Sequence, residues 1–169
     1  MKKAAVIKVI FEDKHLLIIN KPAGISVTFD RSGNRDIITE LMQTGCKSAM
    51  PKLRLVHRLD KDTSGVMAIA KDIETQRVLT YAFEERKVHK IYLALVSGFL
   101  RETSGIIDAP LARSKRNKEI MEVASSGGKS AQTRWHAIAN FGSVALLAVE
   151  PLTGRTHQIR VHLAYAGMP

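Results

Sequence analysis

Short apolar runs separated by charged turns dominate the pattern of hydrophobic and polar positions along this chain. Residues 6–11 and 16–19 are apolar runs on either side of a charged turn, Glu12–Lys14, which is typical of a β-hairpin. Pro22 and Gly24 then end regular structure. Further apolar or alternating runs predict strands over 66–71, 90–96, 133–138 and 144–149, the last two as a pair.

Three windows carry a helical spacing of apolar residues, namely 36–45, 73–86 and 156–166. Asp72 stands where a cap of the second helix is expected, and Gly45 is a plausible end of the first. Because predicted strands outnumber helices, the pattern predicts an α+β fold with a mixed, mostly antiparallel sheet. No linker or internal repeat divides the sequence, so we expect one domain over residues 1–169.

The balance of charge suggests a polyanionic partner. The chain has 26 Lys and Arg against 16 Asp and Glu, a formal net charge of +10, which RNA, DNA or an anionic membrane would satisfy. No segment reaches the roughly 18 apolar residues of a membrane helix, and Lys8 and Glu12 interrupt the first apolar run too early for an export signal. Cys46 is the only cysteine, which excludes an intrachain disulfide and a Cys-rich zinc site. We therefore expect a cytoplasmic protein.

A polar turn with two carboxylates among basic residues precedes the predicted strand at 66. His57–Gly65 has the sequence H-R-L-D-K-D-T-S-G. A polar turn that leads into a buried strand is a common way to fix a reactive side chain at a sheet edge, although an ordinary surface turn is the simpler interpretation. A second basic, polar stretch, Pro151–His162, lies a hundred residues later and favours the functional interpretation.

Together the two stretches resemble the RluA-type family of RNA pseudouridine synthases. The family motif H-R-L-D-x-x-T-S-G is matched at every fixed position, and Gly154–His162 matches G-R-x-H-Q-[IL]-R-x-H. Asp13–Gly24 looks like the family's opening strand and K-P-x-G turn, and Lys90–Tyr92 looks like its K-x-Y element. The resemblance runs from about residue 9 to the last residue.

The resemblance implies a curved, mostly antiparallel sheet with flanking helices and a central RNA-binding cleft. It implies an isomerase that converts a specific uridine of ribosomal or transfer RNA after the base is flipped out, without a cofactor or a metal. The family pattern continues into further strands beyond Pro169, so the domain looks truncated at its C-terminal end. RNA is the expected partner, a membrane is not, and we take a monomer as the default.

The resemblance assigns three catalytic residues. Asp60 is the catalytic aspartate, and a free aspartate with a pKa of about 3.9 is ionised at neutral pH. Arg160 is the cation that pairs with it, although the sequence alone also allows a solvated helix residue. Tyr92 could stack on uracil and help to remove the C5 proton, or it could be a core tyrosine. Attack on the sugar, attack on the base and assisted elimination all stay open.

Five further residues are predicted to bind the substrate. The resemblance implies that Arg58 fills the space left by the flipped nucleotide, with a phosphate contact as the alternative. Arg155 lies near a helix start, which favours anions, and it could line a phosphate track. Its partners in that track would be Lys47, Lys52, Arg54, Arg113, Lys115, Arg116 and Lys118. The others are His57, His157 and Gln158, of which the last two are interpreted as hydrogen-bonding braces of the cleft.

Two weaker hypotheses compete with the synthase. A catalytically silent RNA-binding module of the same fold would need the basic surface but not Asp60. A metal-dependent phosphoesterase would use His57, Asp60 and Asp62, but these residues, with His157 and His162, match no recognised zinc spacing, and we predict no metal site. Asp62 occupies a variable position of the motif and is interpreted as a solvent-facing turn residue.

Overall fold

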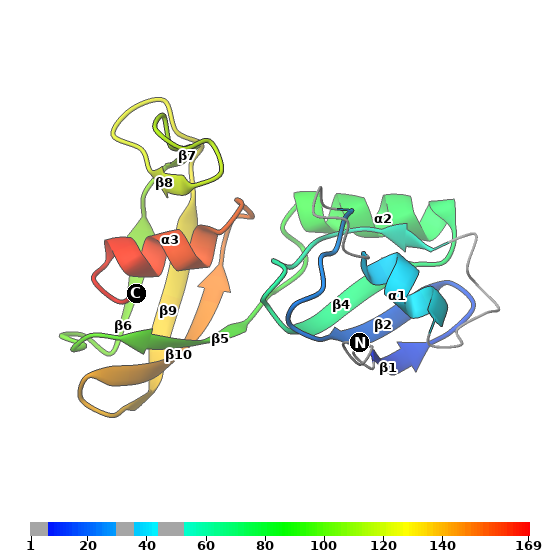
Figure 1. Ribbon diagram of the computed structural model, residues 1–169, viewed down its shortest axis with the longest axis horizontal. Coiled ribbons are helices and arrows are strands. Elements are labelled where there is room, and N and C mark those ends of the chain that lie inside the picture. The colour runs from blue at the N-terminus through cyan, green and yellow to red at the C-terminus, as the bar shows by residue number, and fades with distance from the viewer. Residues whose placement is uncertain (1–6, 30–35, 44–52) are drawn as a thin grey trace. The chain divides into compact units, whose positions relative to one another are not determined.

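The structure, a computed structural model, describes residues 7–29, 36–43 and 53–169. The chain divides into two compact units, residues 1–87 and residues 88–169, which are described separately (Figure 1). Each unit is built on a four-stranded sheet, and every strand pair among the described residues is antiparallel. This division into two compact units does not test the prediction that residues 1–169 form one domain, which stays a prediction.

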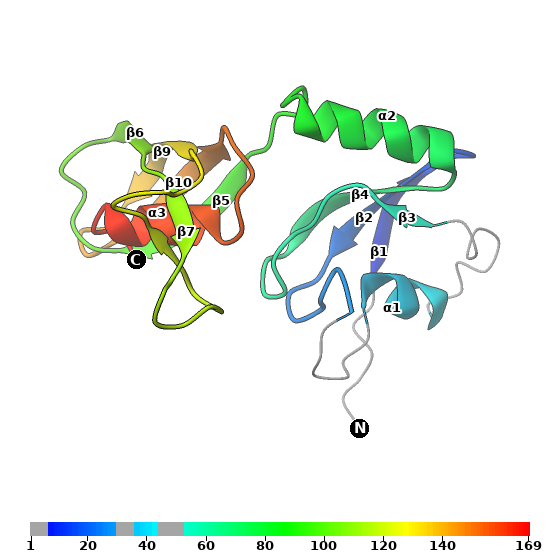
Figure 2. The same cartoon turned by 90° about the horizontal axis from the view of Figure 1, so that it is seen from above.

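The first unit is a sheet with a helix on each face (Figure 2). Its strands have the order β1-β2-β4-β3, with the bounds Lys8–Glu12 (β1), Leu16–Lys21 (β2), Arg54–Leu55 (β3) and Gly65–Ala70 (β4). The helices are α1 (Ile37–Gln43) and α2 (Ile73–Glu84). The core contains the fully buried side chains Leu17, Ile19, Ile37, Leu41, Met67 and Ile69. Alternate residues of β2 and β4 therefore supply the apolar face, as the period of a strand requires.

Local sequence explains where these elements begin. The Asp13 carboxylate accepts the backbone N–H groups of His15 and Leu16, both at 2.7 Å, and so closes the β1–β2 hairpin that the sequence predicts. Asp72 is the N-cap of α2 and accepts from the Thr75 amide at 2.7 Å, which confirms its predicted role. Hydrogen bonds from the Thr75 amide and then from His15 lower the pKa of Asp72 to about 2. Gly45, Cys46, Lys47 and Lys52 lie outside the described residues.

A buried lysine holds together the loop that joins β3 to β4. Lys21 ends β2, is fully buried, and donates three hydrogen bonds from its ammonium group. The acceptors are the backbone carbonyls of Pro22 at 2.9 Å, Lys61 at 3.0 Å and Thr63 at 2.8 Å. An ammonium has three donors, so this site satisfies it completely and offsets much of the cost of burying the charge.

The second unit packs one helix on a four-stranded sheet of order β5-β10-β9-β6 (Figure 1). The bounds of its sheet strands are Tyr92–Ser97 (β5), Ser104–Asp108 (β6), Gln132–Asn140 (β9) and Val144–Pro151 (β10). Helix α3 (Gln158–Tyr165) lies across β9 and β10 and buries Leu163 against Val96, Trp135, Leu147 and Val149. Strands β7 (Leu111–Arg113) and β8 (Met121–Val123) form a separate ribbon, which the sequence does not predict.

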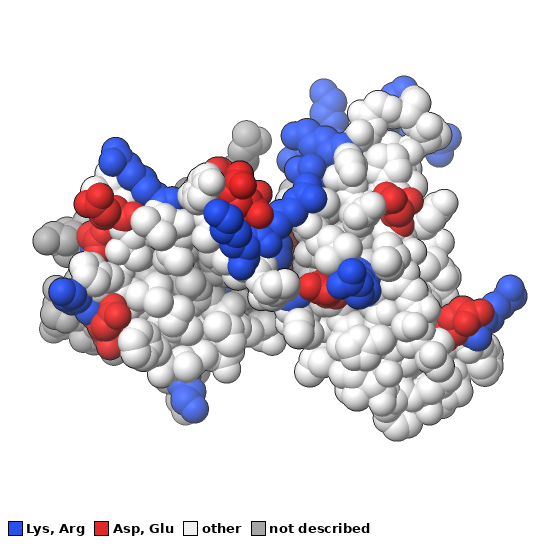
Figure 3. Space-filling model, turned by 180° about the vertical axis from the view of Figure 1, so that it is seen from behind, with Lys and Arg blue, Asp and Glu red and all other residues white. Residues whose placement is uncertain are grey.

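One face of this second sheet carries no helix among the described residues. Leu93 and Leu95 of β5 are each 70% exposed on it, while Val96, on the opposite side of the strand, is buried. The prediction that Leu95 belongs to the core is therefore wrong, because the alternation of β5 places Tyr92, Ala94 and Val96 inside instead. Ile69, predicted with it, is fully buried. A large part of this unit's surface is uncharged in the view from behind (Figure 3).

The observed elements confirm the α+β class. Strands dominate, the paired strands are antiparallel, and the three helices begin and end within two residues of their predicted bounds. Among the described residues, no helix is both long enough and apolar enough to cross a membrane.

Replacing the Lys21 brace should destabilise the first unit. In Lys21→Met three partly buried carbonyls lose their donor, and each such loss costs about 1–3 kcal/mol. We expect the free energy of unfolding in urea, followed by circular dichroism, to fall by roughly 2 kcal/mol or more. Lys14→Met, which removes an exposed lysine of the same unit, is the matched control and should change it by less than about 0.5 kcal/mol. Equal denaturation midpoints for the two variants would contradict the brace.

Candidate active site

The turn that precedes β4 is held by main-chain hydrogen bonds as well as by Lys21. The Thr63 N–H donates to the Asp60 carbonyl at 3.1 Å, and the Gly24 N–H donates to the Lys61 carbonyl at 2.9 Å. Gly65 has a φ of +134°, a conformation that a residue with a side chain rarely adopts. The K-P-x-G turn and the H-R-L-D-x-x-T-S-G turn, distant in the sequence, are thus one hydrogen-bonded body.

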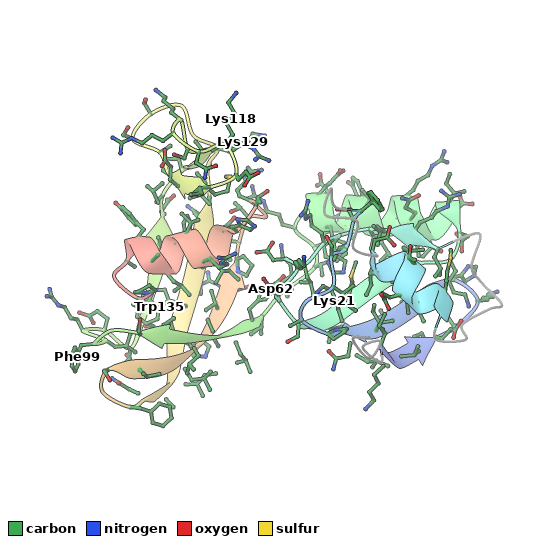
Figure 4. The ribbon with its side chains drawn as sticks, viewed as in Figure 1. Lys21, Asp62, Phe99, Lys118, Lys129 and Trp135 are labelled. Atoms are coloured by element: carbon green, nitrogen blue, oxygen red, sulfur yellow. The ribbon has the colours of Figure 1, made fainter. Side chains whose placement is uncertain are left out.

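The charges of both carboxylates of this turn, Asp60 and Asp62, act on the buried ammonium of Lys21. Lys21 and Asp62 are labelled in Figure 4. Burial lowers the pKa of Lys21, and the charges of Asp62 and then Asp60 oppose that shift. Asp60 is half-buried and Asp62 is exposed, so Asp62 faces solvent as the sequence predicts. The ammonium that braces the backbone of this turn therefore also attracts the two carboxylates that the turn carries.

The residues just before Asp60 alternate between inside and outside. The His57 ring stacks on Phe83 of α2 with centroids 4.4 Å apart, and its Nε2 accepts the Ala68 N–H at 3.0 Å. Leu59 is buried, whereas Arg58 between them is exposed. His57 is thus a support of the turn, and Arg58 is the side chain of this segment that can reach a large ligand.

In the second unit, Tyr92 begins β5 beside the end of β10. It pairs with Val149, and its half-buried ring packs against the core that includes Trp135 and Leu163. The Lys90 ammonium lies close to Gly154, 4.0 Å from the point where a Cβ of residue 154 would stand. The K-x-Y element and the start of the second motif therefore meet at one end of this sheet.

Gln158 determines the course of the turn that carries Arg155 and His157. Its side-chain oxygen accepts from the Thr153 hydroxyl at 2.8 Å and from the Arg155 N–H at 2.9 Å. Its amide nitrogen donates to the Gln132 carbonyl at 2.9 Å and to the Thr133 hydroxyl at 3.0 Å. His157, the residue before Gln158, has a φ of 54°, a left-handed conformation that is strained for a residue other than glycine.

His162 lies one helical turn further along α3 and is also fully buried. Its Nδ1 lies 2.8 Å from the Thr133 hydroxyl and its Nε2 lies 2.9 Å from the Ala109 carbonyl. Burial lowers the pKa of His162, against smaller raising effects from the Ala109 carbonyl and Asp108. The imidazole is therefore a neutral structural group at neutral pH.

The two predicted arginines of this motif differ in their surroundings. Arg155 is half-buried, and its Nε donates to the Ser130 carbonyl at 3.0 Å, which ties it to the segment that leads into β9. Arg160 is exposed on α3. The Arg155 guanidinium thus links two segments of the protein, while the Arg160 guanidinium projects from the helix.

Basic side chains gather at the end of the second unit formed by β7 and β8 (Figures 3 and 4). The exposed members are Arg113, Lys115, Arg116, Lys118 and Lys129. Arg113 donates to the Lys118 carbonyl at 2.6 Å and so closes the loop between the two strands. We call this set the basic ribbon.

The predicted site residues fall into two groups, one in each unit. His57, Arg58 and Asp60 share the turn before β4, whereas Tyr92, Arg155, His157, Gln158 and Arg160 belong to the second unit. The pairing of Asp60 with Arg160 stays a prediction. Two polar residues connect the site to its scaffold in ways that sequence reasoning did not predict. Lys21 is the lysine of the K-P-x-G turn, but its buried, bracing role was not predicted. Thr133 was missed, and its position at the start of a predicted strand was the available signal. Among the described residues no three His, Cys, Asp or Glu side chains cluster as metal ligands.

Comparison with known sequences gives a consistent result. Residues 15–165 match the RNA pseudouridylate synthase family. Ribosomal large subunit pseudouridine synthase D of Borreliella burgdorferi is 39% identical over 96% of this chain and 52% of its own length. The synthase D of Nitrosomonas europaea is 42% identical over 99% and 48%. Synthase C of Vibrio vulnificus is 38% identical over 95% and 50%. The chain spans about half the length of the curated relatives it matches.

Solved structures agree with the sequence comparison. Human RNA pseudouridylate synthase domain containing 4 superposes with a TM-score of 0.79 at 29% identity and covers 95% of this chain and 65% of its own chain. Human RNA pseudouridylate synthase domain containing 1 has the same fold, with a TM-score of 0.85 at 24% identity over 100% of this chain and 69% of its own. With the family match over residues 15–165, these likenesses show that the chain belongs to the RNA pseudouridylate synthase family.

Proposed function

We propose that this chain carries the catalytic part of an RNA pseudouridine synthase that acts on ribosomal RNA. The family membership and the names of the bacterial relatives support the reaction and the substrate class. The observation that carries the proposal is the position of Asp60, a half-buried carboxylate in a turn that Lys21 and main-chain hydrogen bonds hold rigidly. Rigid placement of one carboxylate is the main requirement of this chemistry.

The reaction rearranges bonds within one nucleotide and consumes nothing. The bond between ribose C1′ and uracil N1 breaks, the base turns, and C5 forms a bond to C1′. The C5 hydrogen then leaves as a proton, and N1 gains one. Atoms and electrons balance without an oxidant, a reductant or a phosphoryl donor.

Asp60 is the residue that acts on the nucleotide in this proposal. It attacks the sugar or the base, or assists the departure of the base, and these routes remain alternatives. Arg160, exposed on α3, neutralises the carboxylate, and the half-buried Tyr92 stacks on the uracil and helps to remove the C5 proton.

The surrounding residues bind the rest of the RNA. Arg58 is exposed next to Asp60, where a planar cation can replace the stacking that a flipped base loses. Arg155 and the basic ribbon contact phosphates, and their charge fits the net +10 of the chain. His57 and His157 shape the site from within the protein. A cytoplasmic location and a monomeric state stay predictions.

Removing the Asp60 carboxylate should abolish pseudouridine formation. We expect Asp60→Asn to slow single-turnover conversion of ribosomal RNA fragments by on the order of 10³-fold or more, with RNA affinity largely retained. Chemical mapping of pseudouridine measures the conversion and a filter assay measures the affinity. Asp62→Asn, an exposed carboxylate of the same turn, is the control and should keep its activity. An Asp60→Asn protein that converts uridine at the parent rate would show that another residue is the catalyst, and an inactive parent that binds RNA would favour the silent binding module.

Neutralising the basic ribbon should weaken RNA binding in a salt-dependent way. Each phosphate contact to a single strand contributes about 0.7 to the slope of log affinity against log salt. A variant with Lys115→Gln, Arg116→Gln and Lys118→Gln should therefore lose up to about 2 in that slope. Lys8→Gln, Lys14→Gln and Arg77→Gln together remove the same charge from exposed positions of the first unit. Equal losses in the two triple variants would mean that net charge, rather than the ribbon, binds the RNA.

A further inference from the structure

The second unit contains a buried hydrogen-bond network in which chemistry determines which group donates and which accepts. The Ala109 carbonyl can only accept, so His162 Nε2 carries a hydrogen and donates to it at 2.9 Å. In the neutral ring, His162 Nδ1 is then an acceptor, and the group beside it at 2.8 Å is the Thr133 hydroxyl, which must donate. Thr133 Oγ1 in turn accepts from Gln158 Nε2 at 3.0 Å.

The other end of the network is determined in the same way. The Gln132 N–H donates to Thr153 Oγ1 at 3.1 Å, and the Thr153 hydroxyl donates to Gln158 Oε1 at 2.8 Å. The Arg155 N–H supplies the second hydrogen bond to that oxygen at 2.9 Å. No buried side-chain nitrogen or oxygen among the described residues lacks a hydrogen-bond partner. In the series of hydrogen bonds that runs from the Gln132 N–H to the Ala109 carbonyl, each bond therefore has a defined donor and a defined acceptor.

Thr133 lies at the centre of this network and touches α3 at two successive turns. Gln158 and His162 are four residues apart, so they stand on the same face of the helix, and both bond the one hydroxyl of Thr133. Arg160 lies between them in sequence, roughly 200° around the helix from Gln158 at 3.6 residues per turn, and is exposed. The Thr133 hydroxyl on β9 is therefore the one group that joins both of these α3 side chains, and together with the Gln132 and Ala109 carbonyls it holds the rotation of α3 about its own axis.

We propose that Thr133 is a positioning residue of the site: its hydroxyl sets the direction in which Arg160 leaves α3 and the course of the turn from Gly154 to His157. Thr133 is fully buried in a strand and does not reach a substrate itself. Its effect passes through Gln158 to the Arg155 N–H and through His162 to the helix. This inference rests on the proposed function, since the groups positioned are those that would bind RNA.

Two substitutions at residue 133 separate the hydroxyl from the shape of the side chain. Thr133→Val keeps the volume and removes the hydroxyl, whereas Thr133→Ser keeps the hydroxyl and removes a methyl group. A displacement of about 1 Å at a site can cost on the order of 10²-fold in rate, so we expect kcat of Thr133→Val to fall roughly 10- to 100-fold. Thr133→Ser should stay within about 3-fold of the parent, even though the lost methyl lowers its thermal stability.

The experiment measures kcat and KM for RNA on the folded fraction of each variant. A loss of kcat in Thr133→Val with recovery in Thr133→Ser supports the proposal. Parent-like kcat in both variants overturns it and leaves the network with a purely stabilising role. A loss in both would equally count against it, because the hydroxyl would not be the cause.

A measurement on the parent protein tests the network without activity and without any variant that fails to fold. Nitrogen-15 NMR of the histidine rings should show His162 as the neutral tautomer with hydrogen on Nε2 at pH 7.5. Hydrogen on Nδ1, or on both nitrogens, would reverse the hydrogen bond to Thr133 and overturn the proposal. If the tautomer is correct but the parent converts no uridine, it is the proposed function that has failed.

Discussion

The arrangement of the first unit depends on one ammonium group that has been taken out of water. Lys21 ends β2 and uses its three donors on three carbonyls, two of which belong to the loop that carries Asp60. An unpaired charge at this depth would be very costly, so the loop has to close around it, and the Gly24 N–H adds a third link to the same loop. The charge that organises the turn also lies beside the carboxylates that the turn presents. One buried charge therefore both braces the turn and attracts its carboxylates.

The second unit solves a similar problem with neutral groups. Gln158 and His162 are buried polar side chains on one face of α3, and both are satisfied by the hydroxyl of Thr133 together with main-chain carbonyls. Polar networks of this kind specify a unique arrangement, because a rotated or shifted helix would leave several groups unpaired. The fixed position of α3 in turn determines where the exposed side chain of Arg160 leaves the helix. In the proposed enzyme, the anionic half of the chemistry comes from the first unit and the cationic half from the second.

Much of the fold can be read from the sequence because its signals are local. The β1–β2 hairpin, the cap at Asp72 and the β9–β10 pair follow from short-range patterns and are observed close to their predicted bounds. The exposure of the Leu95 side chain could not be predicted, because an apolar residue in a strand does not reveal which face of its sheet is covered. Asp60, Tyr92 and Arg160 were predicted from motifs, and their catalytic roles stay predictions. The K-P-x-G motif contains Lys21, but neither its bracing role nor that of Thr133 was predicted, because these contacts span about 40 and 25 residues, which no local pattern records.

The proposed function depends on one event: a carboxylate from residue 60 and a guanidinium from residue 160 act on the same extruded uridine. Asp60 and Arg160 belong to elements held by separate hydrogen-bond networks, one in each unit. The proposal is therefore tested only by a structure in which both side chains are seen together with the RNA. The decisive measurement is a crystal structure of the protein bound to a ribosomal RNA fragment that contains the target uridine. The account predicts an Asp60 carboxylate within about 4 Å of the Arg160 guanidinium, with the flipped base against Tyr92. A bound nucleotide remote from Asp60, or the two side chains separated by solvent in the complex, would contradict it.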